Sequence, residues 1–242
     1  MRETATFKGK VTFSGNTADD DGGGADIVSS ADVVFEDDVI FEENTAGDSG
    51  GGFEARGGTV LTFEGEVEFD ENEASGGDGG AISVSDSKVK FEKEVKFTDN
   101  EARDNGGAVS ADGAAELRFK DEVTFKRNRA KDEGGHVSVR DDASDVVFKE
   151  KTTFVEGVAD YGGAIYVEDS PRFTFKDDAV FEDNKSKKCG GAIASVNDVV
   201  EFQDDADFDD NVDQDDDNSA AGDCDNLCIG GSRPEGTIAC TK

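Results

Sequence analysis

Four acidic side chains recur at a fixed interval and could together hold cations. They lie 28 residues apart, at Asp38, Glu66, Glu94 and Glu122. Carboxylate oxygens are the ligands that Ca²⁺ prefers in proteins. If the fold stacks these residues about 5 Å apart, the carboxylates repel each other unless salt screens them or a divalent cation bridges them. The spacing leaves two interpretations open, a calcium-binding ladder or a solvated acidic face.

Neither familiar calcium motif supports the ladder. The sequence contains no GGxGxDxUx nonapeptide and no DxDxDG loop. Other repeats carry both signs at the equivalent position: Lys10, Lys151, Asp178 and Asp205. We therefore expect no cofactor, with Ca²⁺ as the one option.

The four cysteines could form two disulfide bonds. Three of them are crowded near the C-terminus, as Cys224, Cys228 and Cys240, and the fourth is Cys189. A CDNLC segment with a distant third cysteine is a poor match to a zinc site. Three connectivities are possible. We favour Cys189–Cys228 with Cys224–Cys240, which predicts an oxidising compartment.

The elements that must position these residues repeat about every 28 residues. Glycine pairs begin at Gly23, Gly51, Gly79, Gly106, Gly134, Gly162 and Gly190. Sixteen of the eighteen Phe form pairs six residues apart: Phe7/Phe13, Phe35/Phe41, Phe63/Phe69, Phe91/Phe97, Phe119/Phe125, Phe148/Phe154, Phe175/Phe181 and Phe202/Phe208. An Asn follows the second Phe by three residues in seven of the eight repeats: Asn16, Asn44, Asn72, Asn100, Asn128, Asn184 and Asn211. Gly157 is the exception.

This repeat predicts a solenoid of β-strands. Each repeat holds three short segments of alternating pattern and no helical period, which is typical of one rung of a parallel β-helix. We predict an all-β, right-handed parallel β-helix of about eight rungs of 27–29 residues. The Phe residues should stack as its core. The Asn residues should form a hydrogen-bonded ladder in a turn, and the glycine pairs should mark a bend or a positive φ.

The only histidine and a group of cationic residues are the candidates for catalysis. His136 stands where other repeats have Ala after the glycine pair, so we interpret it as a substituted repeat position. Polysaccharide lyases and epimerases built on parallel β-helices use Asp, Lys and Arg on an exposed strand face. The residues that could serve here are Arg118, Arg140, Lys120, Lys149 and Lys176. Because the three lysines share one repeat position, a basic stripe is the simpler account, and we expect no enzyme.

Two motifs carry a resemblance to a known family. GGA[IV] begins at Gly79, Gly106, Gly162 and Gly190. FxxN begins at Phe13, Phe41, Phe69, Phe97, Phe125, Phe181 and Phe208. Over about residues 7–211 this pattern resembles the Pmp-like repeats of polymorphic outer-membrane proteins, known from chlamydial autotransporter adhesins and algal secreted proteins. The resemblance implies a right-handed β-helix for surface display, adhesion or scaffolding, and it implies no catalytic residues.

Charge and hydropathy limit the partners. The 242 residues carry a net charge of −33, which argues against nucleic acid and anionic membrane surfaces. No apolar run approaches the ~20 residues of a membrane span, so we expect no direct membrane insertion. The partners that fit are divalent cations, a protein partner, a second copy of the chain or a glycan.

The ends of the chain differ from the repeats. From Asp204 to Asp217 nine of fourteen residues are Asp, a run too charged to form a core rung alone. We predict a repeat domain over residues 1–211 and an acidic, Cys-containing C-terminal cap over 212–242. The first residues show no secretory h-region, and the first repeat starts at Phe7 without a glycine pair. We expect a mature or truncated chain. Either a cap for its open N-terminal end lies upstream in a precursor, or this end docks on a partner or another copy.

Together these patterns favour a non-catalytic structural or interaction module in an extracellular or other oxidising extracytoplasmic compartment. Two alternatives remain: a polysaccharide-binding or polysaccharide-modifying β-helix, and a subunit of a larger assembly docked through its N-terminal end.

Overall fold

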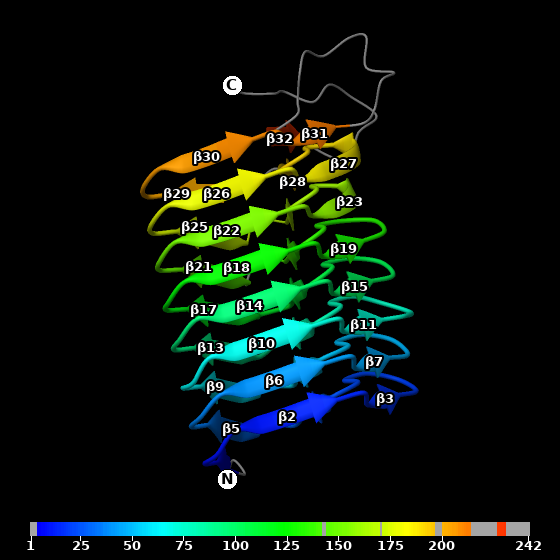
Figure 1. The fold of residues 1–242 in the computed structure, drawn as a ribbon, viewed down its shortest axis with the longest axis vertical. Helices are drawn as coiled ribbons and strands as arrows, with labels where there is room; N and C mark the ends of the chain where they lie inside the picture. Colours follow the sequence, from blue (N-terminus) through cyan, green and yellow to red (C-terminus); the bar gives the residue numbers. More distant parts are fainter. Residues whose placement is uncertain (1–3, 142–143, 170, 197–199, 214–226, 231–242) are drawn as a thin grey trace.

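The computed structural model is an all-β stack of repeats (Figure 1). The structure describes residues 4–141, 144–169, 171–196, 200–213 and 227–230. In these ranges the regular elements are strands, which form four sheets of eight strands each. No helix in the described residues is long and apolar enough to span a bilayer. Neighbouring strands in a sheet are parallel and come from successive repeats. The predicted parallel β-helix is confirmed.

Each sheet takes one strand from every repeat. Sheet A consists of β1 (Thr4–Phe7), β5 (Asp32–Phe35), β9 (Val60–Phe63), β13 (Lys88–Phe91), β17 (Glu116–Phe119), β21 (Asp145–Phe148), β25 (Arg172–Phe175) and β29 (Val200–Phe202). Sheet B consists of β2 (Val11–Ser14), β6 (Val39–Glu42), β10 (Val67–Asp70), β14 (Val95–Thr98), β18 (Val123–Lys126), β22 (Thr152–Val155), β26 (Ala179–Glu182) and β30 (Ala206–Asp209). Sheet C consists of β3 (Thr17–Ala18), β7 (Thr45–Ala46), β11 (Glu73–Ala74), β15 (Glu101–Ala102), β19 (Arg129–Ala130), β23 (Val158–Tyr161), β27 (Lys185–Cys189) and β31 (Val212–Asp213). Sheet D consists of β4 (Ala25–Ile27), β8 (Phe53–Arg56), β12 (Ile82–Ser85), β16 (Val109–Asp112), β20 (Val137–Arg140), β24 (Ile165–Glu168), β28 (Ile193–Val196) and β32 (Leu227–Gly230).

The paired Phe residues form two stacks inside the β-helix, as predicted. The register of sheet A places Phe63 beside Phe91, and that of sheet B places Phe69 beside Phe97. Stacked rings have centroids 4.7 to 5.1 Å apart. The two stacks meet edge to face, as Phe69 and Phe91 do at 6.4 Å. Burial of one such side chain stabilises the fold by about 1.5–3 kcal/mol.

The predicted asparagine ladder is present. It lies at a corner of each rung, and this corner leads into a fourth strand, in sheet C, that the sequence pattern did not show. Asn72 Nδ2 donates to Asn100 Oδ1 at 3.0 Å, and Asn100 Nδ2 donates to Asn128 Oδ1 at 2.9 Å. The residue before each ladder position has a positive φ, for example +53° at Asp99. The chain therefore turns a corner and enters sheet C, so each rung has four strands and not three. Most of these strands have two residues, too few for an alternating pattern.

The glycine positions are shifted in the first two repeats. Gly22 and Gly50 have positive φ and occupy the place of Gly79, so the pairs in register begin one residue before the predicted Gly23 and Gly51. A Cβ on Gly79 would lie 2.2 Å from the Ile82 carbonyl oxygen. Glycine is therefore required there for both conformation and space.

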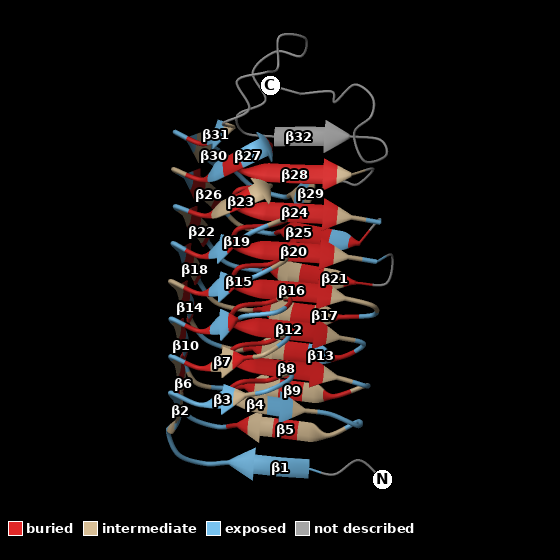
Figure 2. Cartoon of the chain, turned by 90° about the vertical axis from the view of Figure 1, so that its right-hand side faces the viewer, coloured by how far each residue is buried: buried red, intermediate tan, exposed pale blue. Residues whose placement is uncertain are grey.

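The strand pairing continues beyond the predicted domain boundary at residue 211. β31 pairs with β27, and β32 pairs with β28 at the end of sheet D. Figure 2 shows that the strands of sheet D from β8 to β28 are buried along most of their length. The cap over 212–242 stays a prediction, since most of that segment lies outside the described residues.

Candidate functional site

The structure places the four predicted carboxylates in one column on the turns between sheets A and B. Backbone hydrogen bonds set the register: Val39 N donates to Glu66 O at 2.9 Å, and Val67 N donates to Glu94 O at 3.1 Å. Val95 N donates in the same way to Glu122 O at 3.1 Å. The side chains of Asp38, Glu66, Glu94 and Glu122 thus stand on successive rungs at the parallel-strand spacing of about 4.8 Å. We call these four residues the acidic column.

A surface hollow of about 420 Å³ follows the acidic column. Its lining contains six carboxyl side chains and one lysine: Asp38, Glu64, Glu66, Glu94, Asp121, Glu122 and Lys93. One member of the column has an ion-pair partner close by, since Glu94 lies 3.0 Å from Lys96. The hollow is a strongly acidic surface that suits cations or cationic groups.

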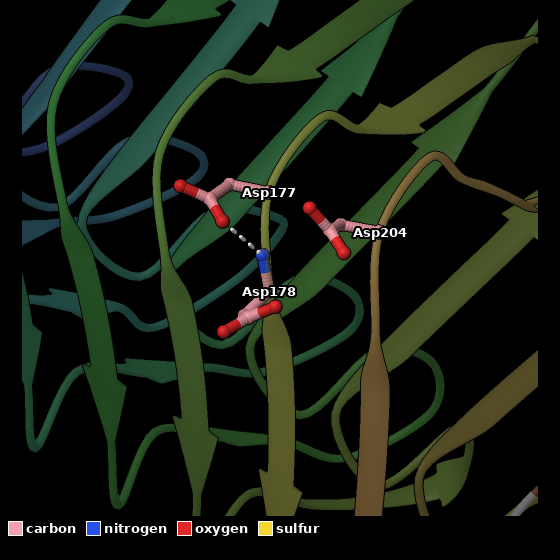
Figure 3. Close-up of side chains that lie close together, drawn as sticks. All are labelled: Asp177, Asp178 and Asp204. Carbon is pink, nitrogen blue, oxygen red and sulfur yellow. Dashed lines mark hydrogen bonds between the residues drawn. The ribbon is translucent and has the colours of Figure 1, made fainter.

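Another group of potential metal ligands lies further along the same turns between sheets A and B, where Asp178 occupies the repeat position of the acidic column. Among the described residues, one group of three carboxylates has ligand oxygens within 4.8 Å of one another: Asp177, Asp178 and Asp204 (Figure 3). Asp177 and Asp178 precede β26, and Asp204 lies on the next rung. Asp177 Oδ1 already accepts a hydrogen bond of 2.8 Å from Asp178 N. Calcium binding at the acidic column stays a prediction.

Lysine and arginine side chains gather on sheet A and the turn after it. A hollow of about 460 Å³ there is lined by Lys90, Arg118, Lys120, Lys149, Arg172 and Lys176 with Asp145, Val147, Thr174, Glu201 and Gln203. The predicted basic stripe of Lys120, Lys149 and Lys176 is therefore real. Arg140, which we grouped with these residues, lies on sheet D instead. The repeat period showed the stripe, but it could not show that Arg140 points from another face.

His136 takes the place of the missing ladder asparagine. Its Nδ1 accepts a hydrogen bond of 2.9 Å from Asn128 Nδ2, and its Nε2 donates to Asn184 Oδ1 at 3.2 Å. The ring is fully buried, and burial lowers the pKa of His136 to about 3. It is therefore a neutral structural group, as predicted. Gly157 makes room for it, because a Cβ there would lie 2.5 Å from the ring.

A buried polar cluster around Arg140 was not foreseen. Arg140 donates to the carboxylate of Glu133, which is 4% exposed, and its Nε lies 3.9 Å from Glu168. Its Cζ lies 6.0 Å from the ring centre of Tyr166. Burial raises the pKa of Asp78, and the nearby positive charge of Arg140 partly opposes this rise in the pKa. The cluster can keep a carboxyl proton to a higher pH than an exposed Asp does.

A second cluster, of which only Glu54 is buried, surrounds the partly exposed Arg56. Arg56 donates to Asp21 and Glu54, and its Nη2 lies 3.1 Å from Asp26. Burial, followed by the neighbouring Asp21 carboxylate, raises the pKa of Glu54 to about 8. The sequence held one signal for these two clusters. Arg56 and Arg140 are cations at a sheet D position where other rungs have Ser85 and Asp112.

One of the four cysteines can be described. Cys189, at the end of β27, is buried and disulfide-bonded. The side chains of Cys224, Cys228 and Cys240 lie outside the described residues. The pairing Cys189–Cys228 with Cys224–Cys240 therefore stays a prediction.

Comparison with known proteins agrees with this architecture. A family model described as "Right handed beta helix region" matches residues 4–122 and 42–206. The chain belongs to this family. The match covers the repeats that carry the Phe stacks and the Asn ladder, and it supports the predicted right-handed β-helix. No curated protein and no solved structure matches this β-helix.

Proposed function

We propose that this β-helix is a non-catalytic interaction module of the surface-display, adhesion or scaffold type. The acidic column carries the proposal, because the repeat holds like-charged side chains in a straight row beside an acidic hollow. A rigid row of carboxylates at strand spacing can bind divalent cations or a cationic partner at several points at once. The stacked Phe and Asn columns supply the rigidity.

The site of action that we propose is an extracellular or other oxidising compartment. The disulfide-bonded Cys189 supports this, because disulfides are rare in reducing compartments. We also propose that the repeats are Pmp-like, and the phased GGA[IV] and FxxN motifs support that finer membership.

Calorimetric titration with calcium chloride tests the acidic column. We expect wild type to bind Ca²⁺, and we expect E66Q/E94Q/E122Q to lose most of the binding heat. E42Q/E73Q/E182Q is the matched control, since it removes three carboxylates on sheets B and C. Absence of binding, or equal losses in the two variants, would refute calcium binding at this column.

A polysaccharide-modifying function is the second candidate, and the basic hollow on sheet A favours it. Arg118, Lys149, Arg172 and Lys176 could bind the carboxylates of a polyuronate. Incubation with polygalacturonate and an assay for new unsaturated or reducing ends tests this candidate. Product formation that Arg172→Ala abolishes would establish it, and its absence would leave the interaction module.

Docking through the N-terminal end is the third candidate, and an exposed apolar surface favours it. Phe7 on β1 is 42% exposed and Val28 is 39% exposed, whereas the equivalent Phe35 is buried. Phe7→Ser should weaken any assembly that forms through this end. A native mass that Phe7→Ser leaves unchanged would reject this route.

A further inference from the structure

On the six central rungs, the position directly after the sheet A strand carries a charge whose sign changes halfway; the first rung has Lys8 there and the last has Gln203. Backbone hydrogen bonds join this position to the preceding rung, for example Glu64 N to Phe35 O at 2.9 Å and Lys149 N to Phe119 O at 3.1 Å. The residues of the six central rungs, in order, are Glu36, Glu64, Glu92, Lys120, Lys149 and Lys176. We call these six residues the reversal column. Three acids stand on consecutive rungs, and three lysines follow on the next three.

Among the described residues, ion pairs neutralise only the middle of the reversal column. Lys120 Nζ lies 3.0 Å from Glu92 Oε2, and both side chains are half-buried. Glu36, Glu64, Lys149 and Lys176 are exposed and make no ion pair with any described residue. The two exposed acids and the two exposed lysines therefore have no neighbour of opposite sign in the column, and like charges at strand spacing repel each other.

The order of the charges is that of a self-complementary surface. Consider a two-fold axis that runs parallel to the strands and passes between Glu92 and Lys120. It would place Glu36 opposite the partner's Lys176 and Glu64 opposite the partner's Lys149. It would also place Glu92 opposite the partner's Lys120. A two-fold contact of this kind uses the same patch on both copies.

The neighbouring columns of sheet A fit the same operation. At the first residue of the strands, Asp32 would face the partner's Arg172. Lys88 would face the partner's Glu116, and these two residues also form an ion pair with each other within the chain. Between the charged columns lie the small side chains of Val34, Thr62, Val147 and Thr174, which allow two sheets to approach. Lys90 would face the partner's Arg118, but each already pairs with a carboxylate, at Glu92 and Asp145 respectively.

We propose that two copies of this chain pair antiparallel through sheet A, with the reversal column of one against that of the other. An anionic glycan fits less well, because Glu36 and Glu64 would repel a polyanion that extended along the column. Eight strands at about 4.8 Å and five residues at about 3.3 Å give a face of about 600 Å², less than the ~800 Å² per partner of a stable complex. The dimer is therefore weak and depends on concentration. The acidic column lies on a different turn position, and Glu64 is the one residue of the reversal column that also lines its hollow.

Charge reversal measured by sedimentation velocity tests the pairing at about 0.1 M salt, where the Debye length is ~10 Å. K149E/K176E and E36K/E64K should each weaken dimerisation by at least about tenfold, since every affected pair becomes like-charged. The quadruple variant E36K/E64K/K149E/K176E keeps the net charge of wild type and should dimerise again. An equimolar mixture of the two double variants should form the heterodimer.

K126E/K131E is the control for K149E/K176E, because it makes the same change in net charge outside sheet A and should leave dimerisation nearly unchanged. Recovery in the mixture would show that both double variants are folded. A wild type that stays monomeric at high concentration would overturn the proposal, and so would a quadruple variant or mixture that fails to recover. Binding of dextran sulfate by a monomeric wild type, lost in K149E/K176E, would overturn it in favour of a glycan site.

Discussion

At the scale of single residues, two exceptions in the repeat turn out to be one structural device. His136 replaces an Ala and Gly157 replaces an Asn, on different segments of the same region. The imidazole joins Asn128 to Asn184 across the rung that has no ladder Asn. Asn184 Oδ1 also accepts a hydrogen bond of 2.9 Å from Gly157 N. The ladder is continuous because a side chain from one strand substitutes for the missing side chain of another.

His136→Ala should therefore destabilise the protein by about 2–4 kcal/mol at pH 7, through a cavity and lost hydrogen bonds. The native pKa of His136, about 3, lies below the unfolded value of about 6.5. Its contribution is thus complete above pH 6.5 and declines as the pH falls toward 3. Urea unfolding of both proteins at pH 7 and pH 4 measures this. A stability difference that grows at pH 4 would contradict the assignment.

Glu54 should give the opposite pH dependence. Its native pKa of about 8 lies above the unfolded value of about 4.5. Its contribution to stability is thus complete below pH 4.5 and is lost as the pH rises through 8. Wild type should lose more stability than Glu54→Gln between pH 5 and pH 8. Unfolding midpoints at the two pH values measure the difference, with the exposed Glu68→Gln as control; equal losses in all three proteins would refute the raised pKa.

At the scale of elements, the Asn ladder joins the sheets at the corner between sheets B and C. Asn44, Asn72 and Asn100 each accept from the ladder Asn of the preceding rung and donate to that of the next. The Nδ2 of each also donates to a backbone carbonyl of the preceding rung, as Asn100 does to Phe69 O at 3.1 Å. Buried polar groups are thereby satisfied at a turn that the strands alone leave unpaired.

Loss of an interior ladder residue should be more damaging than loss of the terminal one. Asn100→Ala removes partners from Asn72, Asn128 and the Phe69 carbonyl and should cost about 2–4 kcal/mol of unfolding free energy. Asn16→Ala is the matched control on the first rung, where the side chain is exposed, and should cost about 1 kcal/mol or less. Chemical denaturation measures both values. Equal effects would show that the ladder does not stabilise the stack as a unit.

At the scale of the whole molecule, charge is distributed unevenly along the β-helix. Nineteen of the 25 Lys and Arg residues lie between Lys88 and Lys188, whereas the chain carries a net charge of −33. The first repeats are therefore strongly acidic, and the middle repeats hold most of the ion pairs, such as Arg127 with Asp99. Repulsion among the carboxylates opposes the compact state at low ionic strength.

Added salt should therefore raise the thermal stability. Between about 0.01 M and 0.15 M salt the Debye length falls from about 30 Å to about 8 Å, which weakens repulsion between columns. We expect Tm to rise by several degrees in sodium chloride, measured by circular dichroism. Choline chloride should give the same rise if screening is the cause. A Tm that falls with salt would show that ion pairs outweigh the repulsion.

The sequence alone determined the architecture and its core. A constant period places identical side chains above one another, so the Phe stacks, the Asn ladder and the basic stripe follow from spacing. The same reasoning placed Asp38 and Glu66 in one column. These features depend only on the contact of each rung with the next, which is local in a repeat structure.

The tertiary structure decided which columns share a face. The two-residue strands of sheet C, the bridge from His136 across Gly157 and the position of Arg140 on sheet D depend on where the chain turns corners. Those corners are set by positive φ at single residues such as Asp99, which leave no periodic signal. The sign change along the reversal column could be read from residue numbers. The inference of a self-complementary surface, however, required the structure, which shows that these side chains stand together at the edge of one exposed sheet.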